Sequence, residues 1–251
     1  MSTRTKTAIG AFVWHDHGSG QPEKAQDFYT RLFGWKTESM QAGGMDYTMI
    51  LADGKQQGGF WPPSGGDTPN WVGHVLVQDV DDTAARAEAA GGSLIVGPTD
   101  APAGRRFAII RDPQGAIVSA YSSPGDTSPP EGVFGWDELL VDDIEAAKSF
   151  YSEVFGWTAS DMDMGDGQSY TIFNSGDQQR AGGMSKPPGA EAMPSRWMPY
   201  ILSSDVDAHA AKAKELGAQI SLEPADVPGV GRLAILTDPT GVPFGLFKTT
   251  Q

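Results

Sequence analysis

The spacing of apolar residues at the start of the chain predicts a strand followed by a helix. The short apolar run Ala8–Trp14 is typical of a strand. Pro22 suits the first position of a helix, and apolar residues then recur on one helical face at the spacing i, i+3, i+4, i+7. These residues are Ala25, Phe28, Tyr29 and Leu32. Gly34 follows the last of them and is predicted to end the helix.

The pattern continues with strands, and then a second strand and helix begin. Two short segments after the first helix look like strands, Tyr47–Leu51 and Gly58–Trp61. A new apolar strand runs from Trp71 to Val77, and Asp79 is suited to cap an alanine-rich helix that stops at Gly91. Three strands complete this half: Ser93–Val96, Arg106–Ile110 and Ala116–Tyr121. Asp112-Pro113-Gln114-Gly115 is predicted to form a type I turn between the last two.

Nearly all of these features occur twice. The motif Phe33-Gly34-Trp35 returns 122 residues later as Phe155-Gly156-Trp157. From Trp71 to Tyr121 the chain aligns without a gap to the segment 126 residues further on, and 18 of the 51 positions are identical. Self-similarity of this kind indicates a duplication. The second half repeats the plan from Val133 to Phe247, so the sequence predicts four βαβββ units and an α+β fold.

A boundary between the two copies is also visible in the composition. The segment Ser122–Glu131 is rich in Pro, Gly and Ser, which is typical of an exposed linker, and it falls where the repeat requires a boundary. We therefore predict a domain over residues 1–122, a linker over 123–131 and a second domain over 132–251.

Composition narrows the classes of function. The 251 residues suffice for two domains, and 39% hydrophobic residues can build their cores. There are no cysteines, so disulfides and thiolate chemistry are excluded, and a reducing cytoplasm is expected. The net charge of −14 would repel nucleic acids. No apolar stretch approaches the roughly 18 residues of a membrane span, and the first seven residues do not look like a secretory signal.

The repeated motifs resemble those of the vicinal oxygen chelate superfamily, the group of glyoxalase I, bleomycin-resistance proteins and extradiol dioxygenases. Three kinds of motif carry the resemblance, each present in both copies: Phe28-Tyr29 with Phe33-Gly34-Trp35 and Phe150-Tyr151 with Phe155-Gly156-Trp157, Asp79-Val80-Asp81 and Asp205-Val206-Asp207, and the Asp-Pro-x-Gly turns at Asp112 and Asp238. Their order and spacing extend over nearly the whole chain. Within the superfamily, the chain is similar to tandem actinobacterial glyoxalase-like proteins. The resemblance implies two glyoxalase-like domains, each a pair of βαβββ units cupped around a cavity.

The resemblance also implies a divalent metal held by His and Glu side chains from facing strands. Carried over position by position, the ligand positions fall on Trp14 and Trp136, Val72 and Met198, and Ser119 and Gly245. Tryptophan, valine, methionine and glycine side chains are not ordinary metal ligands. We therefore expect that the usual metal site is absent from both copies and that the protein uses no cofactor.

A rival metal site is suggested by His15 and His17, which lie two residues apart and so on one face of a strand. These two imidazoles supply only two ligands, and the second copy has Asp137 and Leu139 in their places. The interpretation that we favour is a polar strand end that runs into the loop at Gly18.

Strand alternation places aromatic and acidic side chains together on the predicted cavity face. Trp14 and Asp16 share one face of the first strand, and Trp136 and Glu138 share the equivalent face of the second copy. A carboxylate among aromatic rings could act as a general acid or base, or could simply accept structural hydrogen bonds. Two tyrosines are further candidates for the cavity lining or the core, Tyr47 and Tyr170.

Arg106 and Arg232 each begin a strand, six residues after Asp100 and Asp226 respectively. Each arginine could bind a carboxylate of the ligand, but both copies keep both residues, so we favour a structural tie to the aspartate.

His74 lies on the strand that faces the predicted site, and Tyr200 occupies its place in the second copy. The imidazole could transfer a proton, could donate a hydrogen bond to a ligand, or could be a buried histidine with its hydrogen bonds satisfied.

Three functions are consistent with the sequence. The first is a metal-independent protein that binds a small organic ligand in aromatic cavities and sequesters or modestly transforms it. The second is a metal-dependent glyoxalase-like lyase, hydroxylase or dioxygenase with nonstandard ligands such as His15, His17 or His74. The third is an interaction module with vestigial pockets. We expect a monomer because the fused halves can complete a cavity without dimerisation, while a homodimer stays open.

Overall fold

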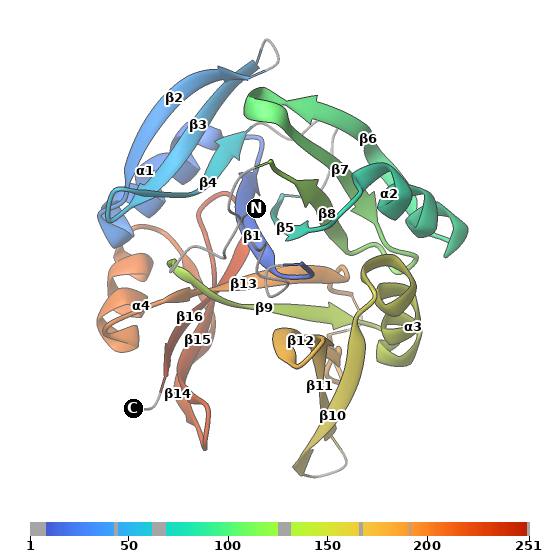
Figure 1. The fold of residues 1–251 in the computed structure, drawn as a ribbon. Coiled ribbons are helices and arrows are strands. Elements are labelled where there is room, and N and C mark those ends of the chain that lie inside the picture. The colour runs from blue at the N-terminus through green and yellow to red at the C-terminus, as the bar shows by residue number, and fades with distance from the viewer. Residues whose placement is uncertain are drawn as a thin grey trace. The chain divides into compact units, whose positions relative to one another are not determined.

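The computed structural model of the chain describes residues 9–42, 45–61, 69–124, 132–165, 168–190 and 192–249. The first half contains β1 (Phe12–Gly18), α1 (Pro22–Phe33), β2 (Lys36–Ala42), β3 (Met45–Ala52), β4 (Lys55–Trp61), β5 (Asn70–Leu76), α2 (Val80–Ala89), β6 (Ser93–Ala101), the short 3-10 helix η1 (Pro102–Gly104), β7 (Arg105–Arg111) and β8 (Ile117–Ser122). The second half contains β9 (Phe134–Val141), α3 (Ile144–Phe155), β10 (Thr158–Gly165), β11 (Gln168–Ser175), β12 (Gln178–Ser185), β13 (Arg196–Leu202), α4 (Val206–Glu215), β14 (Gln219–Val227), β15 (Gly231–Thr237) and β16 (Pro243–Thr249). Figure 1 shows these elements.

The strands form two sheets of eight, one from each half of the sequence. The hydrogen-bonded order is β2-β3-β4-β1-β5-β8-β7-β6 in the first sheet and β10-β11-β12-β9-β13-β16-β15-β14 in the second. The two orders are identical when strands are matched between copies. In every βαβββ unit the first and last strands pair in parallel, as β1 does with β4 and β13 does with β16. The predicted α+β fold of two tandem, paired βαβββ halves is therefore confirmed.

The helix ends are formed by the residues that the sequence indicated. Pro22 opens α1, and Gly34 closes it in the left-handed conformation at φ 74°. The side chain of Asp79 caps α2 by accepting a hydrogen bond from the backbone N–H of Asp82. Asp143 and Asp205 cap α3 and α4 in the same way. No helix among the described residues is long and apolar enough to cross a membrane.

Two strand predictions were wrong. We placed the first strand at Ala8–Trp14, but β1 begins at Phe12 and continues to Gly18, so it includes His15 and His17. β2 was not located because its polar sequence carries no apolar alternation, and β10 is likewise exposed along its whole length. Both lie at the edge of a sheet, where only one neighbouring strand is paired. Ala8 and residues 125–131 of the predicted linker lie outside the described residues.

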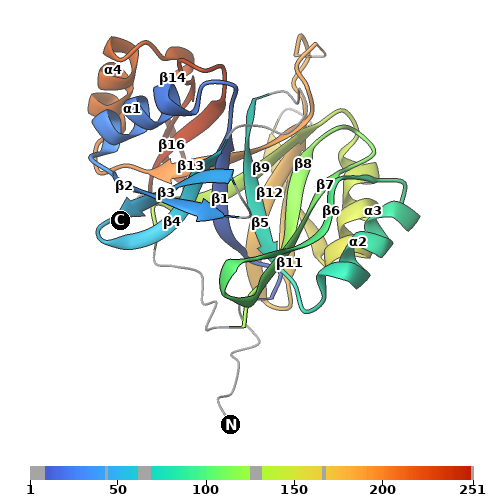
Figure 2. The same ribbon diagram turned by 90° about the horizontal axis from the view of Figure 1, so that it is seen from above.

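The chain divides into two compact units that do not follow the two sequence halves. One unit comprises Met1–Trp14, Gly73–Pro130 and Asp137–Trp197, and the other comprises His15–Val72, Glu131–Trp136 and Met198–Gln251. Hereafter they are unit 1 and unit 2. In unit 1, α2 packs beside α3, and in unit 2, α1 packs beside α4 (Figures 1 and 2). Each unit therefore combines one βαβββ unit from each copy, and the domain limits given above stay a prediction.

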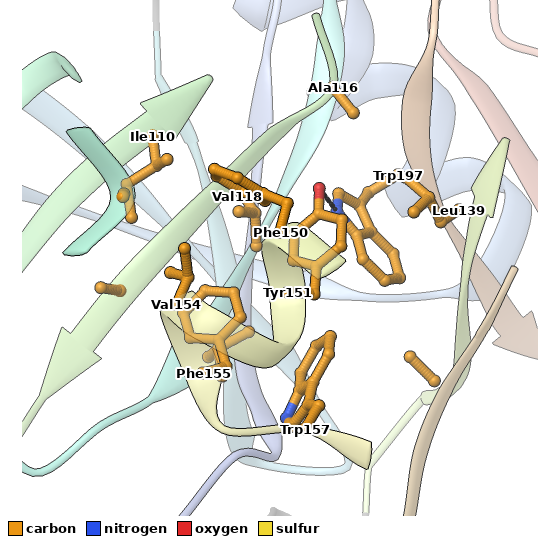
Figure 3. Close-up of a cluster of buried hydrophobic side chains, with 14 of the residues drawn as sticks. Ile110, Ala116, Val118, Leu139, Phe150, Tyr151, Val154, Phe155, Trp157 and Trp197 are labelled. Atoms are coloured by element: carbon orange, nitrogen blue, oxygen red, sulfur yellow. Dashed lines mark hydrogen bonds between the residues drawn. The ribbon is translucent and has the colours of Figure 1, made fainter. Parts of the chain in front are cut away.

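The core of unit 1 lies between α3 and the strands of the other copy. Phe150, Tyr151 and Val154 of α3 pack with Ile110 and Val118, as Figure 3 shows. Burial of such a side chain stabilises a fold by roughly 1.5–3 kcal/mol.

The core of unit 2 is built in the same manner from α1 and the opposite copy. Phe28, Tyr29 and Leu32 pack with Phe244 and Leu246 of β16. Aromatic and aliphatic side chains from both copies thus contribute to each core.

Candidate functional site

A chain of buried hydrogen bonds connects the two copies within unit 2. The indole N–H of Trp71 donates to Tyr29 Oη at 3.2 Å, and the Tyr29 phenol donates to Asp238 Oδ2 at 3.1 Å. His17 Nε2 lies 2.8 Å from the same carboxylate oxygen, and the side chains of His17 and Asp238 are fully buried. Asp238 Oδ1 accepts hydrogen bonds from Thr240 and Val242, which shapes the Asp-Pro-x-Gly turn. This network joins the first helix of one copy to the last turn of the other.

Unit 1 contains the same network with one member changed. Trp197 Nε1 donates to Tyr151 Oη at 2.8 Å, which is a dashed line in Figure 3, and Tyr151 donates to Asp112 Oδ2 at 2.9 Å. Leu139 occupies the place of His17.

The missing histidine changes the electrostatics of the two aspartates. Burial raises the pKa of Asp112 above its ordinary value of 3.8, although hydrogen bonds from Tyr151 and backbone N–H groups oppose the shift. Burial acts in the same direction on Asp238, but the hydrogen bond and charge of His17 outweigh it and hold the pKa of Asp238 below 3.8. Burial also raises the pKa of both phenols, so Tyr29 and Tyr151 stay protonated donors. These networks are structural, since the indoles, phenols and carboxylates satisfy one another inside the cores, while His17 Nδ1 is buried without a hydrogen-bond partner among the described residues.

The two histidines of β1 belong to this buried side of the strand. The His15 ring stacks on Phe134, with 4.0 Å between ring centroids. The His17 ring packs edge-on against Trp71 at 5.0 Å. The strand does end at Gly18, as predicted, but both histidines are buried in the core. His17 contacts the distant Asp238, and the local sequence could not reveal this partner.

A carboxylate–phenol pair occurs once in each copy, on the opposite side of the first strand. Tyr47 Oη donates to Asp16 Oδ1 at 2.6 Å within unit 2. Tyr170 Oη donates to Glu138 Oε2 at 3.0 Å within unit 1. Both carboxylates are largely buried, at 9% and 8% exposed, while both tyrosines are half-buried. Charge-assisted hydrogen bonds of this kind are short and strong.

A glycine beneath each tyrosine makes these pairs possible. Gly59 pairs with Asp16 in the parallel β1–β4 ladder, and a Cβ at Gly59 would collide with the Tyr47 ring. Gly182 pairs with Glu138 and would collide with Tyr170 in the same way. The tyrosine ring therefore lies across the glycine to reach the carboxylate on the next strand.

His74 and Tyr200, the matching residues of the two copies, have different surroundings. The His74 ring lies edge-on to Phe107 at 6.5 Å and to Tyr121 at 5.9 Å, and His74 pairs with Ser119 of β8. Tyr200 pairs with Gly245 of β16, and its ring occupies the space that a side chain at Gly245 would need. A large side chain on one strand is thus matched by a glycine on the next.

The two predicted arginines are tied into ion pairs. Arg106 binds Asp100 at 2.6 Å and binds both carboxylate oxygens of Asp81 at 2.7 and 2.9 Å. Arg232 binds Asp226 at 3.1 Å and Asp207 at 2.6 and 2.7 Å. The hydrogen bonds that Arg106 donates to Asp81 and Asp100 raise the pKa of Arg106.

The predicted ties to Asp100 and Asp226 are therefore present. The bidentate contact of each arginine with an aspartate at the start of α2 or α4 was not predicted.

Trp14 and Trp136 are half-buried on the first strand of their copy.

A sequence profile of the Glyoxalase/Bleomycin resistance protein/Dioxygenase superfamily matches residues 18–119 and again 134–246. The chain belongs to this superfamily. The protein named "Putative glyoxylase CFP32" of Mycobacterium tuberculosis is 35% identical, over 99% of this chain and 98% of its own length. The anthracycline biosynthesis protein DnrV of Streptomyces peucetius is 32% identical, over 98% of this chain and 96% of its own length.

Solved structures with the same fold include a glyoxalase and a dioxygenase. The Mn(II)-bound glyoxalase from Novosphingobium aromaticivorans has a TM-score of 0.65 and 18% identity, over 96% of this chain and 82% of its own. The 2,2',3-trihydroxybiphenyl 1,2-dioxygenase from Sphingomonas wittichii has a TM-score of 0.65 and 17% identity, over 95% of this chain and 90% of its own. At this identity the likeness shows the fold alone.

The residues at the superfamily's metal positions do not fit a metal ion. Trp14 and Trp136 offer no lone pair suited to a hard or borderline cation, and the Tyr200 ring blocks any ligating side chain at Gly245. Among the described residues, no three His, Cys, Asp or Glu side chains gather closely enough to hold a metal. We therefore assign no chemistry to a metal at these positions.

Arg105 is a site residue that sequence reasoning missed. Its guanidinium lies 5.9 Å from the centre of the Trp14 ring. Adjacent residues of a strand point to opposite faces, so Arg105 faces away from the ion pairs of Arg106. The sequence did contain a signal for Arg105. Two neighbouring arginines in a strand point to opposite faces, so only one of them could reach Asp81 and the other had to face the opposite side.

Proposed function

We propose that this protein binds a small organic ligand without a metal ion, and that the pairs Asp16–Tyr47 and Glu138–Tyr170 contact the ligand. The observation that carries the proposal is the recurrence of the same carboxylate–phenol geometry in both copies. Each carboxylate lies two residues beyond the tryptophan that stands at the superfamily's first metal position. In this proposal the carboxylate–phenol pairs provide the polar groups for the ligand in place of metal ligands.

The chemistry of the pair suits a ligand that carries hydroxyl groups. A carboxylate accepts hydrogen bonds, and a phenol both donates and accepts one. Such a pair is suited to exchange hydrogen bonds with the hydroxyl groups of a ligand, and a partly buried carboxylate can also remove a proton. Sequestration and a modest proton-transfer reaction are both compatible with this arrangement.

The relatives suggest the class of ligand. DnrV is named as an anthracycline biosynthesis protein, which favours planar, hydroxylated aromatic compounds as ligands of this chain. The absence of cysteine supports a cytoplasmic location within this proposal.

The test combines metal analysis with ligand binding. Purified protein is expected to contain no stoichiometric metal and to bind a hydroxylated anthraquinone equally well with and without EDTA, as measured by tryptophan fluorescence. Tyr47→Phe and Tyr170→Phe should each weaken binding at one copy by roughly 5–13-fold, because each removes a hydrogen bond worth about 1–1.5 kcal/mol. Stoichiometric metal together with loss of binding in EDTA would overturn the proposal.

The competing function is a metal-dependent glyoxalase-like lyase, hydroxylase or dioxygenase. The relative named as a glyoxylase favours it. Turnover of the methylglyoxal–glutathione adduct with added Mn(II), Ni(II) or Zn(II), lost on His74→Ala, would establish this function instead.

A further inference from the structure

One face of unit 1 gathers polar and aromatic side chains around a cation. Register places Phe107 opposite Tyr121 and His74 opposite Ser119, and directly paired residues share a face of the sheet. The ring contacts of His74 with Phe107 and Tyr121 confirm this arrangement. Arg105 lies two residues before Phe107 on the same strand, so it belongs to the same face.

Arg105 differs from its neighbour in its partners among the described residues. Its guanidinium lies over Trp14, and it makes no ion pair with any carboxylate in the described part of the chain. Arg106, one residue later, is bound by two aspartates. A half-buried guanidinium whose contact among the described residues is an aromatic ring is suited to bind an anion, because the ring of Trp14 compensates its charge only in part.

The second copy cannot form this face. Gly231 stands in the place of Arg105, with φ 155°, and a Cβ there would collide with the backbone carbonyl of Lys248. Tyr200 and Gly245 replace His74 and Ser119, and Phe247 replaces Tyr121. The cation and its polar neighbours are therefore specific to the first copy.

We infer that the face of unit 1 formed by Trp14, His74, Arg105, Phe107, Ser119 and Tyr121 binds the anionic group of an aromatic ligand, with Arg105 as the anion-binding residue. The inference rests on the proposed function and adds to it that the first copy selects an acid. A planar guanidinium binds a carboxylate through two parallel hydrogen bonds, while the rings of Trp14 and Phe107 contact the flat body of the ligand. A net charge of −14 repels anions at long range, so selection of an acid requires such a local cation.

The test uses two probes that differ only in charge, 2-naphthoate and 2-naphthalenemethanol, titrated into the full-length protein by calorimetry. Wild-type protein should bind the carboxylate at least about 10-fold more tightly than the alcohol, and added salt should reduce this preference. Arg105→Gln should abolish the preference and leave the affinity for the alcohol within about 2-fold, whereas Arg105→Lys should retain part of it. Arg31→Gln, which removes an exposed helical arginine, is the matched control and should retain the full preference.

The outcomes separate this inference from the proposed function. Equal binding of both probes by the wild type, or an unchanged preference in Arg105→Gln, overturns the inference and leaves the proposed function standing. Failure of the wild type to bind either probe up to about 1 mM counts against both.

Discussion

The phenol of Tyr29 donates a hydrogen bond to the carboxylate of Asp238, which lies 209 residues further along the chain. The reciprocal bond joins Tyr151 of the second copy to Asp112 of the first. Each copy thus supplies the helix tyrosine of one core and the turn aspartate of the other. The motifs that define the repeat are therefore partners in two buried networks.

Replacement of either tyrosine should destabilise the protein. Tyr29→Phe and Tyr151→Phe each leave a buried carboxylate and a buried indole N–H without their shared partner, so each should lower the free energy of unfolding by about 1–3 kcal/mol. Urea denaturation measures the effect. The two networks share no residue, so the double variant should show the sum of the single effects; a change below about 0.5 kcal/mol in either single variant would contradict the assigned role.

Replacement of His17 by the residue of the other copy should convert one network into the other. In His17→Leu, burial should dominate at Asp238 as it does at Asp112, so the pKa of Asp238 should rise from below 3.8 to above it. Carboxyl-carbon NMR titration follows both aspartates, and Asp112 is the internal control because it has no contact with residue 17. A pKa of Asp238 that stays below 3.8 in the variant would show that His17 is not the cause.

The two turn aspartates should affect acid stability with opposite sign. The pKa of Asp238 is lower in the folded state, so its carboxylate stabilises the fold at pH values above 3.8. This contribution is lost as the pH falls through the folded-state pKa. The pKa of Asp112 is higher in the folded state, so the folded protein binds this proton more tightly than the unfolded chain. The contribution of Asp112 to stability is therefore most favourable at pH values below 3.8, and it is lost as the pH rises through the folded-state pKa.

Asp→Asn variants measure these contributions. From about pH 3 to pH 6, the stability difference between wild type and Asp238→Asn should increase, and the difference between wild type and Asp112→Asn should decrease. Slopes of the same sign for both variants would refute the assignment.

The glycines beneath the tyrosines should tolerate no side chain. Gly59→Ala or Gly182→Ala should displace Tyr47 or Tyr170 from its carboxylate, with a loss of about 1–3 kcal/mol of stability and weaker ligand binding at that copy. Gly97→Ala is the matched control, because Gly97 is also a strand glycine and has open space where its Cβ would lie. Thermal unfolding and fluorescence titration report the two effects, and a harmless Gly59→Ala would show that the Tyr47 position is not fixed by the glycine.

The sequence predicted the helices well because their signals are local. The i, i+3, i+4, i+7 spacing that includes Phe28 lies within one segment, as does the cap at Asp79. β2 and β10 lacked such a signal, since polar edge strands are defined by the neighbour with which they pair.

The site was predicted in parts. Alternation along the first strand predicts that Asp16 and Glu138 face a cavity, while their pairing with Tyr47 and Tyr170 depends on the register of three strands and could not be predicted from it. His17 was misinterpreted because its partner is 221 residues away. Arg106 was correctly expected to form a structural tie to Asp100. Arg105 was overlooked, although its place beside Arg106 in a strand indicated that the two side chains point to opposite faces.

The crossed hydrogen bonds from Tyr29 to Asp238 and from Tyr151 to Asp112 also bear on the origin of the chain. A single ancestral repeat could have satisfied its own tyrosine and aspartate in this geometry only by exchange with an identical subunit, as an isologous homodimer. Gene fusion would then have made an intermolecular contact intramolecular. From that point the two ends of each network could diverge separately, as histidine at position 17 and leucine at position 139 have done.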